Sequence, residues 1–323
     1  MPNVVELFAG AGGLGIGLKK AGFTPLMYVD FNKDCINTLN ANYQNVDIRH
    51  MSVSELHLDH LKGQIDLLAG GPPCQSFSQA GQRKGFDDTR GNMMLEYIRL
   101  IRECEPKVFL IENVVGLTTH ESGDTFRKII ELLQPMHEIH HKILNATNYG
   151  VAQKRKRVFI IGLHRSHSNL HFEFPEPLTT NPTLRDALLN CPISEGMKYP
   201  LKKEAVLRLI PPGGCWINLP EAIKKEYMGK SLESGGGKRG IARRIAWDEA
   251  CLTLTTSPMQ KQTERCHPDH TRPFTVREYA RIQSFPDTYT FTGSIASQYK
   301  QIGNAVPCEL AYHMGKAIYK SLS

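Results

Sequence analysis

The chain has 323 residues, of which 41% are hydrophobic and 22% are charged, as in ordinary globular proteins. No stretch approaches about 18 consecutive apolar residues, and no basic segment precedes the apolar run 4–8, so neither a membrane span nor a signal peptide is predicted. The eight cysteines form no C-x-x-C pair, which argues against a disulfide framework and a four-cysteine zinc site. We therefore expect a cytoplasmic protein with reduced thiols, built as one large domain and one smaller domain.

The formal net charge of +7 is modest, but the positive excess is unevenly distributed. Residues 181–272 contain 15 Lys/Arg and 10 Asp/Glu, a net charge of +5, which leaves 24 Lys/Arg and 22 Asp/Glu, a net charge of +2, elsewhere. A basic face on one part of a nearly neutral protein suits a polyanionic partner, although a solvated surface is the simpler alternative.

The N-terminal region has the pattern of a nucleotide-binding opening. Val4–Phe8 is predicted to be a strand, and Gly10, Gly12 and Gly15 then match G-x-G-x-x-G. A second strand, residues 25–29, ends at Asp30, at the distance where a carboxylate can bind ribose hydroxyls. These features predict an adenosine-containing cofactor, either a nicotinamide dinucleotide or S-adenosylmethionine. A tight strand-to-helix turn without a ligand is the alternative.

Cys74 follows a predicted buried strand, residues 65–69, on a loop that contains two successive prolines. Proline cannot continue the strand and fixes φ, so the cysteine is held at the carboxyl end of a strand, where open α/β sheets bind ligands. This context favours a thiolate nucleophile over a buried structural cysteine. The polar segment 79–92 is longer than a plain connector, which predicts a lid or binding loop, with a disordered segment as the alternative.

Glu112 follows the predicted strand 108–111, after a helix predicted over 93–104. A carboxylate at the end of an apolar strand is costly unless it is paired or used, so Glu112 is predicted to be a site residue rather than a structural cap. Since Cys74 and Glu112 follow consecutive strands of a parallel sheet, they are expected at the same edge.

Gln153, Arg155 and Arg157 alternate along the entry to another strand, which directs all three side chains to one side. Two guanidinium groups on one face suit a phosphate or a base carbonyl, while a solvated basic turn is the alternative.

Six motifs in this order resemble those of DNA cytosine-5 methyltransferases of the bacterial restriction-modification type. They are F-A-G-A-G-G at 8–13, P-P-C-Q at 72–75, E-N-V at 112–114, Q-x-R-x-R at 153–157, R-P-F-T-V-R-E-Y-A-R-I-Q-S-F-P-D at 272–287 and G-N-A-V-P at 303–307. The resemblance runs from Val4 to Pro307. One departure is that His50-Met51 stands where the family usually has an Asp-Ile pair contacting adenine.

The resemblance implies an α/β fold with a mostly parallel, Rossmann-like sheet of the S-adenosylmethionine-dependent methyltransferase kind. Residues 1–178 plus 299–323 would form a discontinuous catalytic and cofactor-binding domain. Residues 179–271 would form an inserted target-recognition domain, with a hinge or bridging helix at 272–298 and a DNA cleft between the domains.

The resemblance also implies a role for each matched residue. The Cys74 thiolate would add to C6 of a flipped-out cytosine, protonated Glu112 would bind N3, and Arg157 would bind O2. The implied catalytic set is Cys74, Gln75, Glu112, Arg155 and Arg157. The implied S-adenosylmethionine pocket comprises Phe8, Gly10, Gly12, Gly13, Leu14, Asp30, Phe31, Pro73, Leu95, Asn304 and Ala305, and S-adenosylhomocysteine would be the product.

The basic excess of the implied recognition domain agrees with a grip on duplex DNA. The candidate DNA contacts are Ser78, Gln79, Arg83, Lys238, Arg239, Arg243, Arg244, Gln260 and Lys261. No metal is expected, because Cys266-His267-Pro268-Asp269-His270 offers too few ligands at suitable spacing.

Three alternative functions share part of this pattern. A nicotinamide-dependent dehydrogenase would explain the glycine turn but not Cys74, Glu112 and the arginine pair. An RNA or tRNA cytosine-5 methyltransferase uses similar chemistry, and the long basic insert favours DNA over it. The third is a catalytically silent DNA-binding regulator. The preferred hypothesis, a DNA cytosine-5 methyltransferase, predicts a monomer that is associated with the nucleoid through DNA. It also predicts a restriction endonuclease that acts on the same sequence, where the system is complete.

Overall fold

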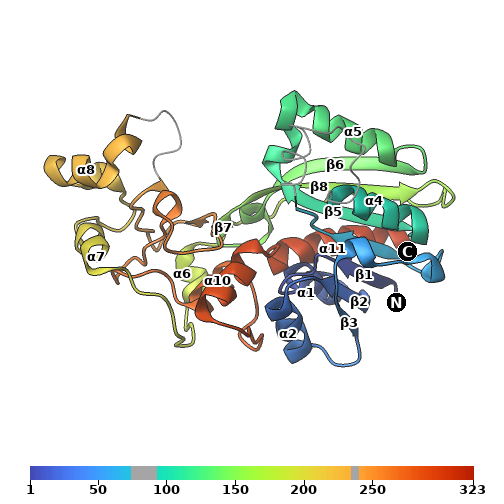
Figure 1. Cartoon of the computed structure of the whole chain (residues 1–323), viewed down its shortest axis with the longest axis horizontal. Coiled ribbons are helices and arrows are strands. Elements are labelled where there is room, and N and C mark those ends of the chain that lie inside the picture. The colour runs from blue at the N-terminus through green and yellow to red at the C-terminus, as the bar shows by residue number, and fades with distance from the viewer. Residues whose placement is uncertain (74–92, 234–239) are drawn as a thin grey trace. The chain divides into compact units, whose positions relative to one another are not determined.

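The computed structural model of the chain describes residues 1–73, 93–233 and 240–323. The chain divides into two compact units (Figure 1). Unit 1 comprises Met1–Asn145, Lys156–Pro177 and Cys308–Ser323, and unit 2 comprises Ala146–Arg155 and Leu178–Pro307.

Unit 1 is built on a seven-stranded sheet in the order β3-β2-β1-β4-β5-β8-β6. Strands β1 to β5 pair in parallel, and β8 pairs antiparallel with both β5 and β6. This confirms the predicted mostly parallel α/β sheet. The strands are β1 (Asn3–Leu7), β2 (Thr24–Asp30), β3 (Asp47–His50), β4 (Leu67–Gly70), β5 (Val108–Val114), β6 (His137–Asn145) and β8 (Lys156–His164).

Helices cover both faces of this sheet. On one face α4 (Met93–Cys104) and α5 (Asp124–Leu133) pack into a core with alternate side chains of the strands. On the other face α1 (Gly13–Lys20) lies so close to the sheet that a Cβ on Gly15 would be 2.5 Å from Glu6 Oε2. Helix α11 (Cys308–Leu322) packs against α1, and α2 (Lys33–Asn42) precedes β3.

Unit 2 has little regular structure around its own apolar core. Its core includes Tyr199, Leu207, Met228 and Ile241. Its elements are β7 (Gln153–Lys154), which pairs in parallel with β9 (Cys251–Leu252), and α6 (Leu184–Leu188), α7 (Leu201–Arg208), α8 (Glu221–Met228), α9 (Val276–Ile282) and α10 (Ile295–Asn304).

The chain also forms short 3₁₀ turns. They are η1 (Val53–Glu55), η2 (Asp59–Leu61), η4 (Val115–Thr118), η5 (His120–Gly123), η6 (Ala146–Tyr149), η7 (Trp216–Asn218), η8 (Gly229–Leu232) and η10 (Lys261–Thr263).

Helix α9 lies within the segment 272–298, for which a hinge or bridging helix was predicted, and a capping box fixes its start. The Thr275 hydroxyl accepts from the Glu278 backbone N–H, and the Glu278 carboxylate accepts from the Thr275 N–H at 2.7 Å. The same carboxylate pairs with Arg272 at 2.7 Å. The motif residues Thr275 and Glu278 therefore satisfy N–H groups that a helix start leaves unpaired.

The two units divide the chain at other places than the predicted functional domains. Residues 179–298, predicted as recognition domain and hinge, lie in unit 2, but so do 146–155 and 299–307. The catalytic, recognition and bridging roles of these segments stay predictions.

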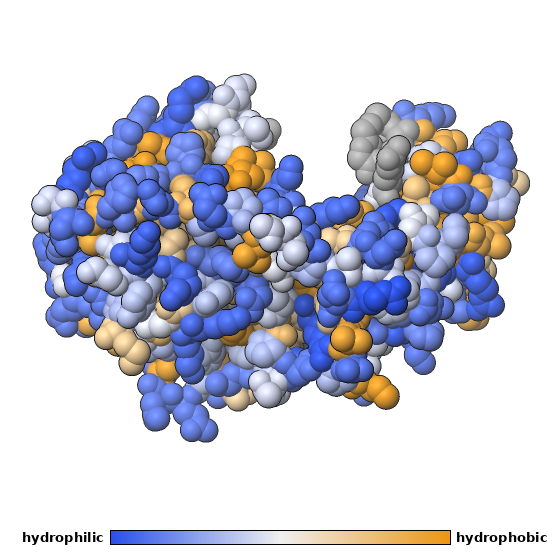
Figure 2. Space-filling view, turned by 180° about the vertical axis from the view of Figure 1, so that it is seen from behind, coloured by the Kyte–Doolittle hydropathy of each residue, from blue (hydrophilic) through white to orange (hydrophobic). Residues whose placement is uncertain are grey.

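The surface is predominantly polar on the face shown in Figure 2, where hydrophobic residues are scattered among hydrophilic ones. No helix in the part of the chain that the structure describes is long and apolar enough to cross a membrane.

Candidate active site

The glycine turn between β1 and α1 is shaped by left-handed backbone conformations. Phe8, Gly10 and Gly12 have φ values of 56°, 53° and 75°. The turn is closed by the Gly12 N–H, which donates to the Ala9 carbonyl at 2.8 Å. A Cβ built on Gly10 meets no atom within 4 Å, so its backbone faces open space. An open glycine turn at a helix N-terminus is suited to a polar ligand that approaches the backbone closely.

Asp30, at the end of β2, is bound to this turn. Its Oδ2 accepts from the Gly10 N–H at 2.8 Å, and its Oδ1 accepts from the Asn32 N–H at 2.8 Å. Burial raises the pKa of Asp30, and the hydrogen bonds from Asn32 and Gly10 oppose that rise. The next side chain, Phe31, is 71% exposed. A carboxylate and an open aromatic face thus lie beside the glycine turn, as a nucleoside requires.

His50-Met51, the departure from the family pattern, lies at the end of the neighbouring strand β3 and binds the segment that carries Asp30 and Phe31. A ring nitrogen of His50, Nε2, lies 2.9 Å from the Phe31 carbonyl oxygen. The Met51 N–H donates to the Asp30 carbonyl at 3.2 Å. These bonds fix the segment that carries Asp30 and Phe31.

Glu6 is a buried carboxyl beneath the glycine turn, 2% exposed. Burial raises its pKa well above the usual glutamate value, the Asp30 carboxylate adds to this, and the Gly15 backbone N–H opposes it. The folded protein therefore holds this proton more tightly than the unfolded chain does. The stabilisation is full below the unfolded pKa of glutamate and is lost as pH rises toward the folded pKa.

We expect Glu6→Gln, a neutral isostere, to remove the loss of stability that Glu6 causes as pH rises. Its free energy of unfolding should exceed that of the wild type at neutral pH, and the gap should widen as pH rises. Urea unfolding between about pH 5 and pH 8 measures the gap. A gap that stays constant, or narrows with pH, would contradict a raised pKa at Glu6.

Glu112 and Arg157 form an ion pair between adjacent antiparallel strands. The distance from Arg157 Nε to Glu112 Oε1 is 3.0 Å, and the two side chains are 14% and 11% exposed, respectively. Arg157 pairs in register with Val114, two residues beyond Glu112 on the same face of β5. The structure therefore brings together two of the predicted catalytic side chains.

The chain leading to Cys74 is attached to the strand that carries Glu112. Asn113 donates from Nδ2 to the Pro72 carbonyl at 2.8 Å. A Cβ on Gly71 would lie 3.0 Å from Glu112 Oε2. Pro73 is exposed at the end of the described segment, and Cys74 and Gln75 lie outside the described residues. The last described residues before Cys74 are thus anchored beside Glu112.

Arg155 belongs to unit 2 and lies inside it. Its side chain is 2% exposed, and Nη1 donates to the Leu254 carbonyl at 3.2 Å while Nη2 donates to the Asn304 carbonyl at 3.4 Å. These contacts engage the Arg155 guanidinium within unit 2, in contrast to that of Arg157, and the catalytic role of Arg155 stays a prediction.

The remaining predicted cofactor residues occupy different environments. Gly13 and Leu14 begin α1 and are buried, the Asn304 side chain is exposed at the end of α10, and Ala305 is half-buried. Leu95 lines a groove of about 370 Å³ on α4 with Arg99, Arg102 and Leu132 of α5 among its neighbours. Its role in cofactor binding stays a prediction that this position does not strengthen.

Arg243 and Arg244, predicted to contact DNA, are engaged within unit 2. Arg243 pairs with both oxygens of Glu249, at 2.6 and 2.7 Å. Arg244 is 4% exposed and donates to the carbonyls of His267 and Leu207. Both guanidinium groups hold unit 2 together in the free protein, and their contact with DNA stays a prediction.

The other predicted DNA contacts fall into two groups. Gln260 is exposed, whereas Lys261 donates to the Tyr227 carbonyl and lies 4.9 Å from the centre of the Tyr227 ring. Outside the described residues are Ser78, Gln79, Arg83, Lys238 and Arg239.

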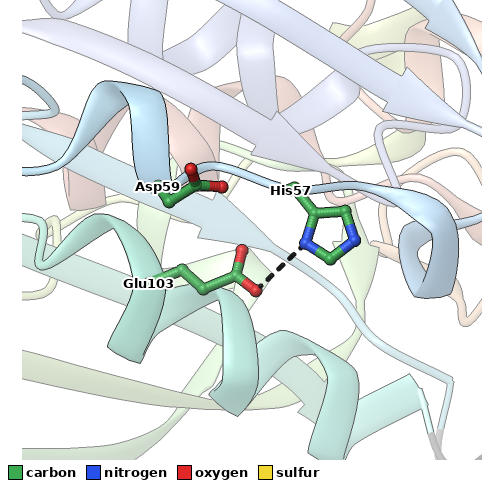
Figure 3. A group of neighbouring side chains, drawn as sticks. All are labelled: His57, Asp59 and Glu103. Atoms are coloured by element: carbon green, nitrogen blue, oxygen red, sulfur yellow. Dashed lines mark hydrogen bonds and ion pairs between the residues drawn. The ribbon is translucent and has the colours of Figure 1, made fainter.

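His57, Asp59 and Glu103 are the group that could hold a metal among the residues that the structure describes (Figure 3). His57 and Asp59 are exposed, and His57 Nδ1 lies 3.4 Å from Glu103 Oε1. Glu103 already binds the Arg99 guanidinium and accepts from the Leu58 N–H at 3.0 Å. Through these bonds the Glu103 carboxylate attaches segment 53–61 to α4.

The Cys266–His270 stretch, considered for metal binding, forms a turn around a buried histidine. Nδ1 of His267 accepts from the backbone N–H groups of Asp269 and His270, at 3.1 and 3.2 Å. Burial lowers the pKa of His267 to about 4, although Glu278 opposes the shift. The neutral ring thus uses Nδ1 to order its own turn.

Three side chains that shape these sites were given no role by the sequence reasoning. Asn113 stands in the E-N-V motif, and its position beside Glu112 was a signal that could have found it. Glu6 interrupts an apolar strand, which is also a visible signal. Gln283 stands in the motif at 272–287, but the motif does not indicate its partners, which are distant in the sequence.

Comparison with known proteins identifies the class. A family model for C-5 cytosine-specific DNA methylases matches residues 2–320. The Type II methyltransferase M.Sau96I of Staphylococcus aureus is 49% identical, over 99% of this chain and 76% of the relative. M.Eco47II of Escherichia coli is 45% identical, over 98% of this chain and 78% of the relative.

Solved structures agree in fold. A protein assigned as a DNA modification methyltransferase of an E. coli prophage aligns with a TM-score of 0.74 at 27% identity, over 100% of this chain and 99% of its own. A Spodoptera frugiperda DNMT2 mutant, at 16% identity, aligns with a TM-score of 0.72 over 99% of this chain and 100% of its own, and shows the fold alone.

The fold and the matched motifs define an α/β methyltransferase. The chain belongs to the family of C-5 cytosine-specific DNA methylases, as its six ordered motifs predicted. It is therefore an enzyme that requires a methyl donor and acts on DNA, and none of the three alternative functions is favoured.

Proposed function

We propose that this enzyme transfers a methyl group from S-adenosylmethionine to C5 of a flipped-out cytosine in a short duplex sequence, through a covalent bond from Cys74 to C6. The observation that carries the proposal is the Glu112–Arg157 pair beside the anchored Gly71-Pro72 segment. It supports a site with a carboxyl group and a guanidinium next to the loop of the nucleophile.

The open backbone at Gly10, the Asp30 carboxylate and the exposed Phe31 ring fit an adenosine group. Asp30 would bind the ribose hydroxyls and Phe31 would pack against the adenine. When bound there, S-adenosylmethionine would supply an electrophilic methyl group and leave as S-adenosylhomocysteine. Asn304 and Ala305 are proposed as further contacts from the family resemblance.

The residues of the chain would act on the base in a defined order. The Cys74 thiolate adds to C6, which makes C5 nucleophilic toward the methyl group. Once C5 has accepted the methyl group, its proton passes to solvent water, and the electron pair left behind forms the C5–C6 double bond and expels the sulfur from C6, which restores the aromatic ring and frees the Cys74 thiolate. The nucleophile is needed because C5 of cytosine alone is too weakly nucleophilic.

Glu112 and Arg157 would change partners when the base enters. In the free protein the two side chains bind each other, with Arg157 Nε 3.0 Å from Glu112 Oε1. We propose that the base separates the pair, so that Arg157 donates to O2 while Glu112 takes up a proton from solvent and donates to N3. Both contacts withdraw electrons from the ring as the thiolate adds.

The relatives are Type II methyltransferases of bacteria, which supports a role in restriction-modification. A cytoplasmic, nucleoid-associated monomer is the corresponding proposal, with a restriction endonuclease acting on the same sequence where the system is complete.

The direct test is transfer of an isotope-labelled methyl group from S-adenosylmethionine to duplex DNA, with tRNA as competitor. Label appearing as 5-methylcytosine in DNA, and undiminished by tRNA, is the expected result. Label in tRNA alone would overturn the proposed substrate.

Unit 2 offers exposed lysines as phosphate contacts in place of the engaged arginines. Lys198, Lys202 and Lys225 are exposed. We expect the triple Lys→Gln variant to weaken DNA binding and to reduce the slope of log K against log[salt] by about 0.9 for each lysine that contacts a phosphate. DNA affinity measured at several salt concentrations gives the slope.

A matched control changes three exposed lysines of unit 1, Lys62, Lys316 and Lys320, to Gln. The slope should stay close to that of the wild type in this control. Equal slopes in both triple variants would contradict a phosphate-binding role for the unit 2 lysines.

A further inference from the structure

Two buried glutamines of unit 2 form a pair between segments that are far apart in the sequence. Gln153 lies in β7, and Gln283 directly follows α9. Gln153 donates from Nε2 to Oε1 of Gln283 at 3.0 Å, and both residues are 0% exposed. A buried amide pair of this kind is stable only if its remaining donors and acceptors are also bound.

The remaining amide groups bind backbone on both sides of the pair. Gln153 Oε1 accepts from the Leu254 N–H at 3.0 Å. Gln283 Nε2 donates to the carbonyl of Ile302 at 2.8 Å and to that of Ala305 at 3.3 Å. The pair therefore connects three backbone segments: β7, the chain around Leu254, and the end of α10.

The end of α10 is held by side chains in addition to one backbone hydrogen bond, from the Ala305 N–H to the Ile302 carbonyl at 3.2 Å. Helix ends leave carbonyl groups without helical partners. Here Gln283 binds the carbonyls of Ile302 and Ala305, while Arg155 binds that of Asn304 at 3.4 Å. The backbone of Asn304 is thus fixed while its side chain stays exposed.

The opposite side of this turn is closed by backbone. A Cβ on Gly303 would lie 2.2 Å from the Thr255 carbonyl oxygen, so only glycine permits the approach. Tyr279 holds Thr255 in place, since its hydroxyl donates to the Thr255 carbonyl at 2.8 Å and accepts from the Thr255 N–H at 3.1 Å. The backbone conformation of the turn 302–305 is therefore fixed by Gln283 on one side and by Thr255 on the other.

We propose that Gln283 is a positioning residue for methyl transfer, because it holds the turn 302–305 in the conformation that presents Asn304 to the methyl donor. This inference rests on the proposed function, in which Asn304 contacts S-adenosylmethionine. Through Gln153 the same residue fixes β7, which directly precedes Arg155.

The test compares Gln283→Met with the matched control Gln301→Met in the full chain. Gln301 is also buried, at 3% exposed, and also binds backbone, since its Nε2 donates to the Thr292 carbonyl at 2.9 Å. The Gln301 amide also donates from Nε2 to the Ser297 hydroxyl at 3.3 Å. Both variants lose a buried amide, and Gln283→Met removes the hydrogen bonds from Gln283 to the carbonyls of Ile302 and Ala305.

Four quantities separate positioning from stability: the Kd of S-adenosylhomocysteine by calorimetry, the KM and the kcat of methyl transfer, and the Tm. Gln283→Met should raise the Kd and the KM for the donor about tenfold, as expected for the loss of buried hydrogen bonds, with a smaller change in kcat. Gln301→Met should change both by less than about twofold at a similar loss of Tm.

Two further variants make the test independent of folding. Asn304→Ala removes an exposed side chain and should raise the Kd of S-adenosylhomocysteine in the same direction. The double variant Gln153→Met/Gln283→Met should bind S-adenosylhomocysteine like Gln283→Met alone, because paired residues are not additive.

An unchanged Kd of S-adenosylhomocysteine in Gln283→Met or in Asn304→Ala would overturn this inference. Equal effects of Gln283→Met and Gln301→Met would also overturn it. In either case, methylation of DNA by the wild type would leave the proposed function standing. A wild type that binds S-adenosylhomocysteine but methylates no DNA would instead contradict the proposed function.

Discussion

Replacing the thiol of Cys74 with a hydroxyl, in Cys74→Ser, is expected to lower kcat by on the order of 10³-fold or more. A serine hydroxyl is hardly ionised at neutral pH, so it cannot add to C6 as a thiolate does. The contacts assigned to the methyl donor, at Gly10, Asp30 and Phe31, are unchanged by the substitution. Binding of S-adenosylhomocysteine and of DNA should therefore remain within about threefold of the wild type, as expected for a change confined to the chemical step.

Single-turnover methylation and calorimetry measure these two effects separately. Cys191→Ser is a suitable control, because Cys191 is a half-exposed thiol of unit 2 without a proposed role in catalysis. Its rate should equal that of the wild type. Substantial methylation by Cys74→Ser would remove the covalent step from the mechanism.

The second large effect is expected for Glu112→Gln, which should lower kcat roughly 10²- to 10³-fold, the usual cost of one lost electrostatic contact in a transition state. The amide cannot supply the acidic proton that N3 receives. It also leaves the Arg157 guanidinium, 14% exposed, without its counter-charge. A loss of stability of about 3 kcal/mol is therefore expected as well.

The double variant Glu112→Gln/Arg157→Met distinguishes catalysis from stability. Removing both charges should restore much of the Tm, because a buried pair adds little net stability over apolar groups. Activity should not return, since Arg157 is the proposed ligand of O2. Recovery of kcat together with Tm would show that Glu112 acts only through the stability of the ion pair.

Local patterns were sufficient to predict four strands of the sheet of unit 1, which are β1, β2, β4 and β5. The runs ending at Phe8, Val29, Ala69 and Ile111 are short and mostly apolar, and glycine or a charged residue follows each of them within two positions. Such runs form parallel strands with their polar ends at one edge. The same patterns predicted that the polar ends of β4 and β5 meet, and the contact of Gly71 with Glu112 agrees with this.

Long-range polar contacts were not predictable in this way. The pattern Q-x-R-x-R indicated two equivalent arginines on one face, yet Arg157 pairs with Glu112 and Arg155 is enclosed in unit 2. Arg243 and Arg244 were predicted to be available for DNA. Their partners in the protein, Glu249 and backbone carbonyls, come together with them only in the folded unit. A charge in a sequence does not show whether its partner is solvent, DNA or the protein itself.

Bisulfite sequencing of DNA from cells that express this chain, compared with cells that express Cys74→Ser, tests the central claim most directly. The proposed function predicts protected cytosines at one short recurring sequence with the wild type and none with the variant. Absence of protected cytosines in cells where the folded wild type is present would contradict it, as would the same pattern with Cys74→Ser.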